Sequence, residues 1–321
     1  MLKANSKFKV LFKVVAVFLV VLLVATTTAQ AAHWGLSGAL VTHDPTLIKE
    51  GNTWWSFSTG QGIGVKYSGN GTAWTDGIRI FNSALSWWKT YAPAMTTNDV
   101  WAPDVEYYNG RYWVYYSVSE FGKNNSAIGL TSCSSIVRGD WRDDGMVIYS
   151  KAGAHAYNAI DPNLFFDKDG APYLSFGSWF DGIQVVKINP STMKPTGSIT
   201  KIALKSGGIE GPSIMYNGGY YYLFVSIGKC CSGTSSTYKI AYGRSTSITG
   251  PYTDKSGVNM LNGGGTILDA GNSRWIGPGG QDVYKNGSAY ILTRHAYDAQ
   301  NNGTPTLLIS DLYFTGGWPT Y

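Results

Sequence analysis

Apolar and polar positions along most of the chain alternate over short stretches, and helical periodicity is almost absent. Aromatic runs that are rich in Tyr, Trp, Phe and Val follow turn residues, which is typical of short β-strands. Asn-Gly and Asp-Gly pairs before several of these runs favour tight turns between antiparallel strands. The predicted strands of this kind cover residues 53–57, 111–116, 172–176, 220–225 and 289–292, with further strands at 127–130 and 183–188.

The aromatic runs belong to a longer repeat. Each unit opens with a proline next to small or acidic residues, continues through a short apolar stretch and a turn, and then enters the aromatic run. Successive units are about 50–66 residues apart, a period typical of propeller blades. The sequence therefore predicts an all-β protein, a five-bladed β-propeller. The opening prolines are Pro45, Pro103, Pro162, Pro212 and Pro278.

Three acidic residues stand where units open: Asp44, Asp161 and Glu210. A single Asp-Pro pair often only initiates a turn before a strand. Acids at equivalent places in three units are expected to meet at one end of the central channel, because the first strand of each blade lines it. Clustered carboxylates in a cleft are the groups required for acid/base glycoside hydrolysis.

The N-terminal 31 residues have the features of a signal peptide. Four lysines precede an uncharged apolar run at 14–25, and Ala29-Gln30-Ala31 fits the cleavage pattern. The apolar run is shorter than the roughly 20 residues that span a bilayer. We therefore expect export of a single catalytic domain, residues 32–321, that is secreted and extracellular.

The net charge limits the kinds of binding partner that are expected, and the cysteine count limits the disulfides. Four of 25 basic residues lie in the export segment, so 21 basic and 20 acidic residues leave a net charge of +1. This balance gives no electrostatic footprint for nucleic acid or for a membrane after signal removal, and a monomer is expected. Cys133, Cys230 and Cys231 form no disulfide framework. The adjacent pair bridges only through a distorted peptide link, and both the bridged and the free state remain open.

Several motifs, taken in order, resemble glycoside hydrolase family 43, and within it the secreted bacterial endo-α-1,5-L-arabinanases. The resemblance covers the chain from about residue 33 to 321. The motifs that carry it are His43-Asp44-Pro45-Thr46, Trp101-Ala102-Pro103-Asp104, Tyr157-Asn158-Ala159-Ile160-Asp161-Pro162, Ile209-Glu210-Gly211-Pro212, Lys229-Cys230-Cys231 and Arg294-His295-Ala296-Tyr297-Asp298.

The resemblance implies a propeller that hydrolyses arabinan, a side chain of pectin, with inversion at the anomeric carbon. Asp44 would be the general base, Glu210 the general acid, and Asp161 the residue that orients Glu210 and raises its pKa. Such chemistry needs one ionised and one protonated carboxyl group, with room for water between them, and a nearby carboxylate helps to keep the acid protonated.

Other residues allow two interpretations. Trp101, Trp179 and Phe121 offer flat faces to furanose rings or pack between blades. Asn158 and Ser178 bind sugar hydroxyls or serve strand ends. His295 is either a satisfied buried histidine or, by the resemblance, the one protein ligand of a calcium ion that is otherwise held by waters. Such an ion would be structural or would tune the carboxylates electrostatically.

Three functions compete at this stage. The leading one is an extracellular endo-arabinanase. The second is an exo-acting α-L-arabinofuranosidase or β-xylosidase of the same family, and the third is a non-catalytic sugar-binding propeller. Retention of all three acids argues against the third. We also expect residues 33–41 to close the ring by pairing with the last unit around 307–309.

Overall fold

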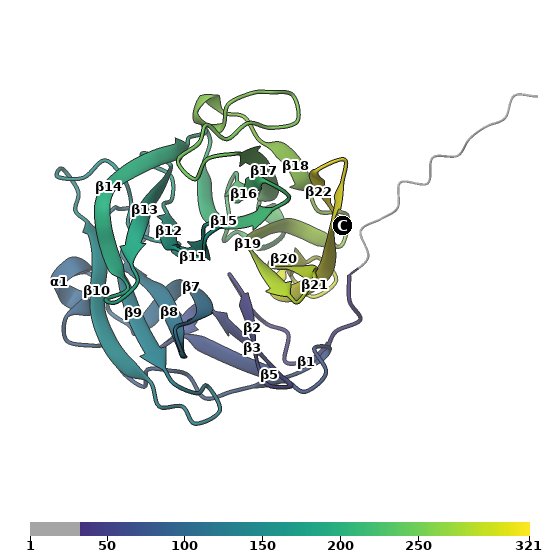
Figure 1. The fold of residues 1–321 in the computed structure, drawn as a ribbon. Coiled ribbons are helices and arrows are strands. Elements are labelled where there is room, and N and C mark those ends of the chain that lie inside the picture. Colours follow the sequence, from purple (N-terminus) through teal and green to yellow (C-terminus); the bar gives the residue numbers. More distant parts are fainter. Residues whose placement is uncertain (1–32) are drawn as a thin grey trace, which may run out of the picture. The chain divides into compact units, whose positions relative to one another are not determined.

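The computed structural model describes residues 33–321, so the predicted signal peptide lies outside the described residues. The described part contains five sheets that surround a central axis (Figure 1), and their strands are antiparallel except where residues 37–38 pair in parallel with residues 73–74. The predicted five-bladed β-propeller is confirmed. Each of the predicted strands at 53–57, 111–116, 172–176, 220–225 and 289–292 is the second strand of a blade.

The inner strand of each blade lies nearest the axis, and the following strands run outwards. Blade 1 contains β2 (Thr46–Glu50), β3 (Thr53–Ser58), β5 (Gly64–Ser68), β6 (Ala73–Asp76) and β1 (Ser37–Gly38). Blade 2 contains β7 (Asp99–Tyr108), β8 (Arg111–Ser119), β9 (Ser126–Cys133) and β10 (Arg142–Ser150), and the short β4 (Gly60–Gln61) pairs with β7.

The remaining three blades have four strands each. Blade 3 contains β11 (Asn163–Phe166), β12 (Pro172–Phe176), β13 (Ile183–Asn189) and β14 (Lys194–Ala203). Blade 4 contains β15 (Ile209–Asn217), β16 (Tyr220–Ile227), β17 (Lys239–Ser245) and β18 (Thr266–Asp269). Blade 5 contains β19 (Trp275–Asn286), β20 (Ala289–Asp298), β21 (Thr304–Thr315) and β22 (Trp318–Thr320).

Helical structure is confined to short connections. These are α1 (Trp88–Tyr91), η1 (Gly233–Ser235) and η2 (Met260–Asn262). Within residues 33–321, no helix is both long and apolar enough to cross a membrane.

The aromatic strands are apolar throughout because both of their faces are buried. Along β8, Trp113 and Tyr115 pack towards blade 3, whereas Val114 and Tyr116 pack towards blade 1. The described residues form five hydrophobic clusters, one at each junction between neighbouring blades. Packing between blades therefore supplies the core, and the inner strands are free to present polar side chains to the axis.

The ring closes through the first described residues, as the sequence predicted. The amide of Trp34 donates to the carbonyl of Ile309 at 2.8 Å, and the amide of Leu307 donates to the carbonyl of Leu40 at 2.8 Å. On its other side the same segment pairs with β6 through β1. Residues 33–42 thus connect the outer strand of blade 1 to the third strand of blade 5.

Candidate active site

A left-handed backbone residue precedes the polar stretch of every inner strand. These residues are Asp44, Ala102, Asp161, Gly211 and Gly280, with φ between 41° and 57°. In blades 2, 4 and 5 the inner strand carries a bulge at this point. Bulges next to active sites redirect side chains, and here they turn the opening residues of the blades towards the end of the channel.

This pattern corrects the predicted repeat in two places. The residue of blade 4 that matches Asp44 and Asp161 is Gly211, so Glu210 stands one position earlier than the sequence register had it. In blade 5 the equivalent residue is Gly280, followed by Gln281, and the unit does not open at Pro278 as predicted. The three acids still approach one another, because a bulge at Glu210 offsets the shift of one residue.

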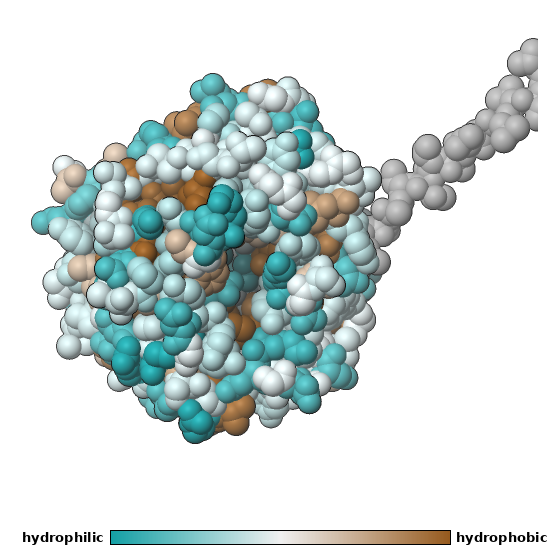
Figure 2. Space-filling model, viewed as in Figure 1, coloured by the Kyte–Doolittle hydropathy of each residue, from teal (hydrophilic) through white to brown (hydrophobic). Residues whose placement is uncertain are grey.

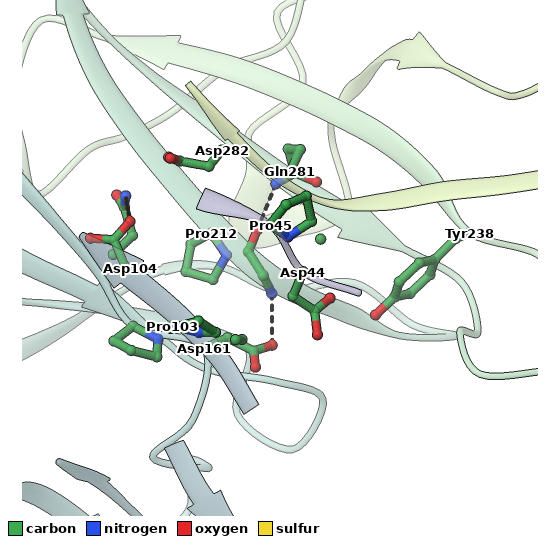
Figure 3. A pocket seen from close by; sticks show the side chains of 14 residues that line it. Asp44, Pro45, Pro103, Asp104, Asp161, Pro212, Tyr238, Gln281 and Asp282 are labelled. Atoms are coloured by element: carbon green, nitrogen blue, oxygen red, sulfur yellow. Dashed lines mark hydrogen bonds between the residues drawn. The ribbon is translucent and has the colours of Figure 1, made fainter. Parts of the chain in front are cut away.

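Asp44 and Asp161 line one pocket at the channel end together with Tyr238, and their side chains point into the same space (Figure 3). Viewed along the ring axis, the surface is hollowed near its centre (Figure 2). Glu210 joins the cluster through its neighbours, because the Gly211 amide donates to Asp161 Oδ2 at 3.0 Å and the Tyr238 hydroxyl donates to Glu210 Oε1.

Farther along the channel, a ring of polar side chains ties the inner strands together. Asn163 Nδ2 donates to Asp104 Oδ1 at 3.1 Å, Thr46 Oγ1 donates to Asp282 Oδ2 at 2.8 Å, and Ser213 Oγ donates to Asp282 Oδ1 at 3.1 Å. Burial and the charge of Asp282 raise the pKa of Asp104 well above its usual value. These bonds join blades 2 and 3, 1 and 5, and 4 and 5, and they hold the strands that carry the acids.

The environment of Asp44 favours its ionised form. Its Oδ2 accepts hydrogen bonds from Thr59 Oγ1 at 2.7 Å and from His43 Nδ1 at 2.8 Å. Burial would raise the pKa of Asp44, but the charge of His43 and these hydrogen bonds hold that pKa well below its usual range. For His43, burial acts to lower the pKa, but the Asp44 carboxylate outweighs it and raises the pKa. The side chain of Asp44 is 19% exposed, so water can reach it.

Asp161 and Glu210 favour the opposite state. Burial is the largest cause that raises the pKa of Glu210, and the charge of Asp44 adds to it. Burial also raises the pKa of Asp161 well above its usual value, and the charges of Glu210 and Asp44 add to that shift. Because repulsion between two carboxylates is mutual, this pair retains a proton to higher pH than isolated carboxyl groups do.

Two hydroxyl groups limit the shift at Glu210. Ser178 Oγ donates to Glu210 Oε2 at 2.6 Å, and Tyr238 donates to Oε1, and both bonds lower the pKa of Glu210. Ser178 was predicted either to bind sugar hydroxyls or to serve a strand end, and its hydroxyl contacts the carboxyl group of Glu210. Tyr238 was not predicted, because it follows a Ser- and Thr-rich loop with no motif to mark it.

The other predicted binding residues lie in different settings. Phe121 is 82% exposed in the loop after β8, and Trp179 is 38% exposed in the loop after β12. Trp101 is partly buried in β7. Asn158 is buried, and its Oδ1 accepts a hydrogen bond from Ser126 Oγ at 2.7 Å. The two exposed rings are thus available for stacking, whereas Asn158 is tied to β9.

His295 belongs to β20 and contacts the backbone of Asp44. Its Nδ1 accepts the amide hydrogen of Asp44 at 3.1 Å, and its ring stacks on that of His43 with centroids 3.7 Å apart. The Nε2 atom is buried without a hydrogen-bond partner among the described residues. Burial and the nearby His43 lower the pKa of His295 well below its usual value, so its imidazole is neutral and suited to a metal ion. His43, Asp44 and His295 each place a ligand atom within 4.8 Å of the others.

A five-bladed propeller whose channel end holds one ionised carboxylate beside a pair that retains a proton defines a glycoside hydrolase of the acid/base type. The chain belongs to glycosyl hydrolases family 43, whose sequence profile matches residues 38–319.

Known relatives share nearly the whole chain. An extracellular endo-α-(1→5)-L-arabinanase of Bacillus subtilis is 57% identical over 91% of this chain and 91% of its own length. A GH43 endo-arabinanase structure from Bacillus licheniformis superposes with a TM-score of 0.86 at 58% identity, covering 90% of this chain and 100% of that one. An α-L-arabinanase structure from Cellvibrio cellulosa in complex with arabinohexaose has a TM-score of 0.84 at 38% identity, covering 87% and 94%.

Proposed function

We propose that this protein is an extracellular endo-α-1,5-L-arabinanase that cleaves arabinan, including the arabinan side chains of pectin. The observation that carries the proposal is the division of protonation states at one channel end, where Asp44 is ionised and the Asp161–Glu210 pair retains a proton. Support for the substrate comes from relatives that are named arabinanases, at 57% and 58% identity. Relatives named extracellular support secretion.

In the proposed mechanism, Asp44 is the general base and Glu210 the general acid of an inverting hydrolysis. Asp44 takes a proton from a water molecule as that water attacks the anomeric carbon. Glu210 gives its proton to the leaving glycosidic oxygen. Asp161 orients the Glu210–Gly211 turn by accepting the Gly211 amide hydrogen, and the mutual repulsion of the Asp161 and Glu210 carboxylates keeps on this pair the proton that Glu210 donates.

Exposed aromatic rings are proposed to supply sugar contacts. Trp179 and Phe121 are exposed and can stack on furanose rings, and the partly buried Trp101 adds a further aromatic side chain. Ser178 acts through Glu210, since its hydroxyl is bonded to that carboxylate.

The expected calcium ion has one candidate protein ligand with a free nitrogen. The unpartnered Nε2 of His295 fits an ion that is completed by waters, which supply the oxygen ligands that calcium prefers. A bound ion would supply positive charge near the carboxylates. Nδ1 of His295 accepts the Asp44 amide hydrogen, which places the ring proton on Nε2. A metal at Nε2 therefore requires that proton to move to Nδ1, where it replaces the bond from the Asp44 amide.

Products resolved by size over time test the proposal. The wild-type protein and Glu210→Ala are incubated with linear and with branched arabinan. Early release of mixed oligosaccharides that is lost in Glu210→Ala supports an endo-arabinanase with Glu210 as the acid. Arabinose as the sole product would instead indicate an exo-acting enzyme, the activity named for a Cellvibrio japonicus relative at 39% identity. Sugar binding without any release would indicate a binding propeller.

A further inference from the structure

The adjacent cysteines Cys230 and Cys231 are joined by a disulfide in the loop between β16 and β17. Cys231 is exposed and has a left-handed backbone with φ of 65°. Its Sγ lies 3.9 Å from Nε2 of His43, the residue that contacts the proposed base. The third cysteine, Cys133, is a buried free thiol. The disulfide-bonded pair Cys230–Cys231 therefore lies beside the proposed acid/base site.

A continuous chain of hydrogen bonds leads from Cys231 to Asp44. The Cys231 amide donates to the Tyr297 hydroxyl oxygen at 2.7 Å. That oxygen lies 2.9 Å from His43 Nε2, and His43 Nδ1 lies 2.8 Å from Asp44 Oδ2. The four residues come from three consecutive blades, with Tyr297 on β20 of blade 5 and His43 in the loop before β2 of blade 1.

The chain of hydrogen bonds persists in both charge states of His43, although the bond between His43 and Tyr297 reverses its direction. If His43 is protonated, both ring nitrogens donate, one to Tyr297 and one to Asp44. If His43 is neutral, the Tyr297 hydroxyl donates to Nε2 and the ring hydrogen on Nδ1 still points to Asp44. In both cases the Tyr297 oxygen accepts the Cys231 amide hydrogen and fixes the plane of the imidazole.

We propose that the Cys230–Cys231 disulfide, through Tyr297 and His43, is a positioning element for the catalytic base. The inference rests on the proposed role of Asp44. A non-glycine residue with positive φ is held at a cost by its surroundings, and here the bond between neighbouring side chains restrains the backbone that aims the Cys231 amide. Without the disulfide, the Cys231 amide no longer donates to Tyr297, and the plane of the His43 imidazole is no longer fixed. Asp44 then loses the hydrogen bond from His43 and keeps only the one from the Thr59 hydroxyl.

The test compares kcat and KM on linear arabinan for the full enzyme before and after treatment with a phosphine reductant. The reductant converts the disulfide to two thiols and becomes a phosphine oxide with oxygen from water. We expect kcat to fall about tenfold, since small misplacements of a catalytic group cost up to about a hundredfold, while KM changes less than about twofold. Tyr297→Phe should show the same loss, and reductant should add nothing further to it.

Three controls make the outcome specific. The double variant Cys230→Ser/Cys231→Ser should match the reduced wild type and ignore reductant, which excludes an effect at Cys133. Tyr252→Phe removes a hydroxyl from another buried tyrosine, one that bonds the Ile248 carbonyl outside the site, and should keep wild-type kcat. Thiol titration of the denatured protein should find one thiol, that of Cys133. Three thiols in the untreated protein would overturn the proposal.

Kinetics separate this inference from the proposed function. Full kcat in the reduced enzyme, or a loss in Tyr297→Phe that reductant multiplies, would overturn the positioning role. A fall in kcat that is accompanied by a rise in KM and by lower thermal stability would show that the disulfide is purely structural. This result would also overturn the positioning role. If Asp44→Asn is inactive while the reduced enzyme is fully active, only the positioning role fails. If Asp44→Asn retains activity, the base assignment itself fails.

Discussion

Replacing Ser178 with alanine measures how the protonation of Glu210 is balanced. Burial and the charge of Asp44 raise the pKa of this carboxyl group, whereas the hydroxyl groups of Ser178 and Tyr238 lower it by stabilising the carboxylate. The Ser178 bond is short, at 2.6 Å, and buried. Removing it leaves the causes that raise the pKa and deletes one of the two donors that oppose them.

The size of the shift follows from the hydrogen bond. A bond to a charged group contributes a net stabilisation of about 1.5–3 kcal/mol, and one pKa unit corresponds to about 1.4 kcal/mol. Because Tyr238 remains and water partly replaces the serine hydroxyl, we expect the pKa of Glu210 to rise by about one unit. A general acid acts in its protonated form. A higher pKa keeps it protonated to higher pH, so the alkaline limb of activity moves upwards by about one pH unit.

The assay is kcat/KM on linear arabinan as a function of pH, which reports the free enzyme. The acidic limb should stay in place, because Ser178 does not contact Asp44. Ser68→Ala is the matched control, since Ser68 is also a buried serine with hydrogen bonds but lies in blade 1 near Asn70. An alkaline limb that stays in place or moves to lower pH in Ser178→Ala would refute the assignment of Glu210 as the acid.

Four further changes test the site and the closure of the ring. Asp44→Asn should lower kcat about 10²–10⁴-fold with the fold intact, and activity within a few-fold of wild type would exclude Asp44 as the base. Gly280→Ala should reduce activity and stability together, because the new Cβ overlaps Asp44 Oδ1 and φ is 53°, and unchanged kcat would contradict this geometry. After chelation, added calcium should raise the Tm of the wild type but not of His295→Ala, and equal rises would remove His295 from the site. Trp34→Ala should cost about 2 kcal/mol in unfolding experiments, and an unchanged Tm would contradict ring closure by this segment.

The fold was predictable because each blade repeats one local pattern. Strands buried on both faces are continuously aromatic and apolar, and turn pairs such as Asn109-Gly110 separate them from the inner strands, so the five blades and their second strands followed from the sequence. The exact register of the repeat was not predictable. Glu210 and Gly211 differ in their roles because a bulge offsets them, and a bulge is a property of two paired strands that one strand's sequence does not reveal.

The residues that set the protonation states were harder to find than the acids. His43 and Tyr297 stand inside the recognisable motifs, but their contact joins residues 254 positions apart. Tyr238 and Thr59 stand outside the motifs, and each donates to one of the proposed catalytic carboxylates from a neighbouring loop or strand end. Desolvation depends on how several blades pack around one group, and for this reason the opposite pKa shifts of Asp44 and Glu210 emerge only from the folded ring.

The two proposed catalytic functions reside in different parts of that ring. Glu210 and its donors Ser178 and Tyr238 belong to the contact between blades 3 and 4. Asp44 follows directly on the closing segment, where the Thr42 amide donates to the Pro305 carbonyl at 3.0 Å, and its partners His43 and Tyr297 span blades 1 and 5. The position of the proposed base therefore depends on closure of the ring between blades 1 and 5. The position of the proposed acid depends on the contact between blades 3 and 4, which follow one another in the sequence. We therefore expect residues 33–42 to support catalysis as well as stability, because they hold together the two blades between which the proposed base is positioned.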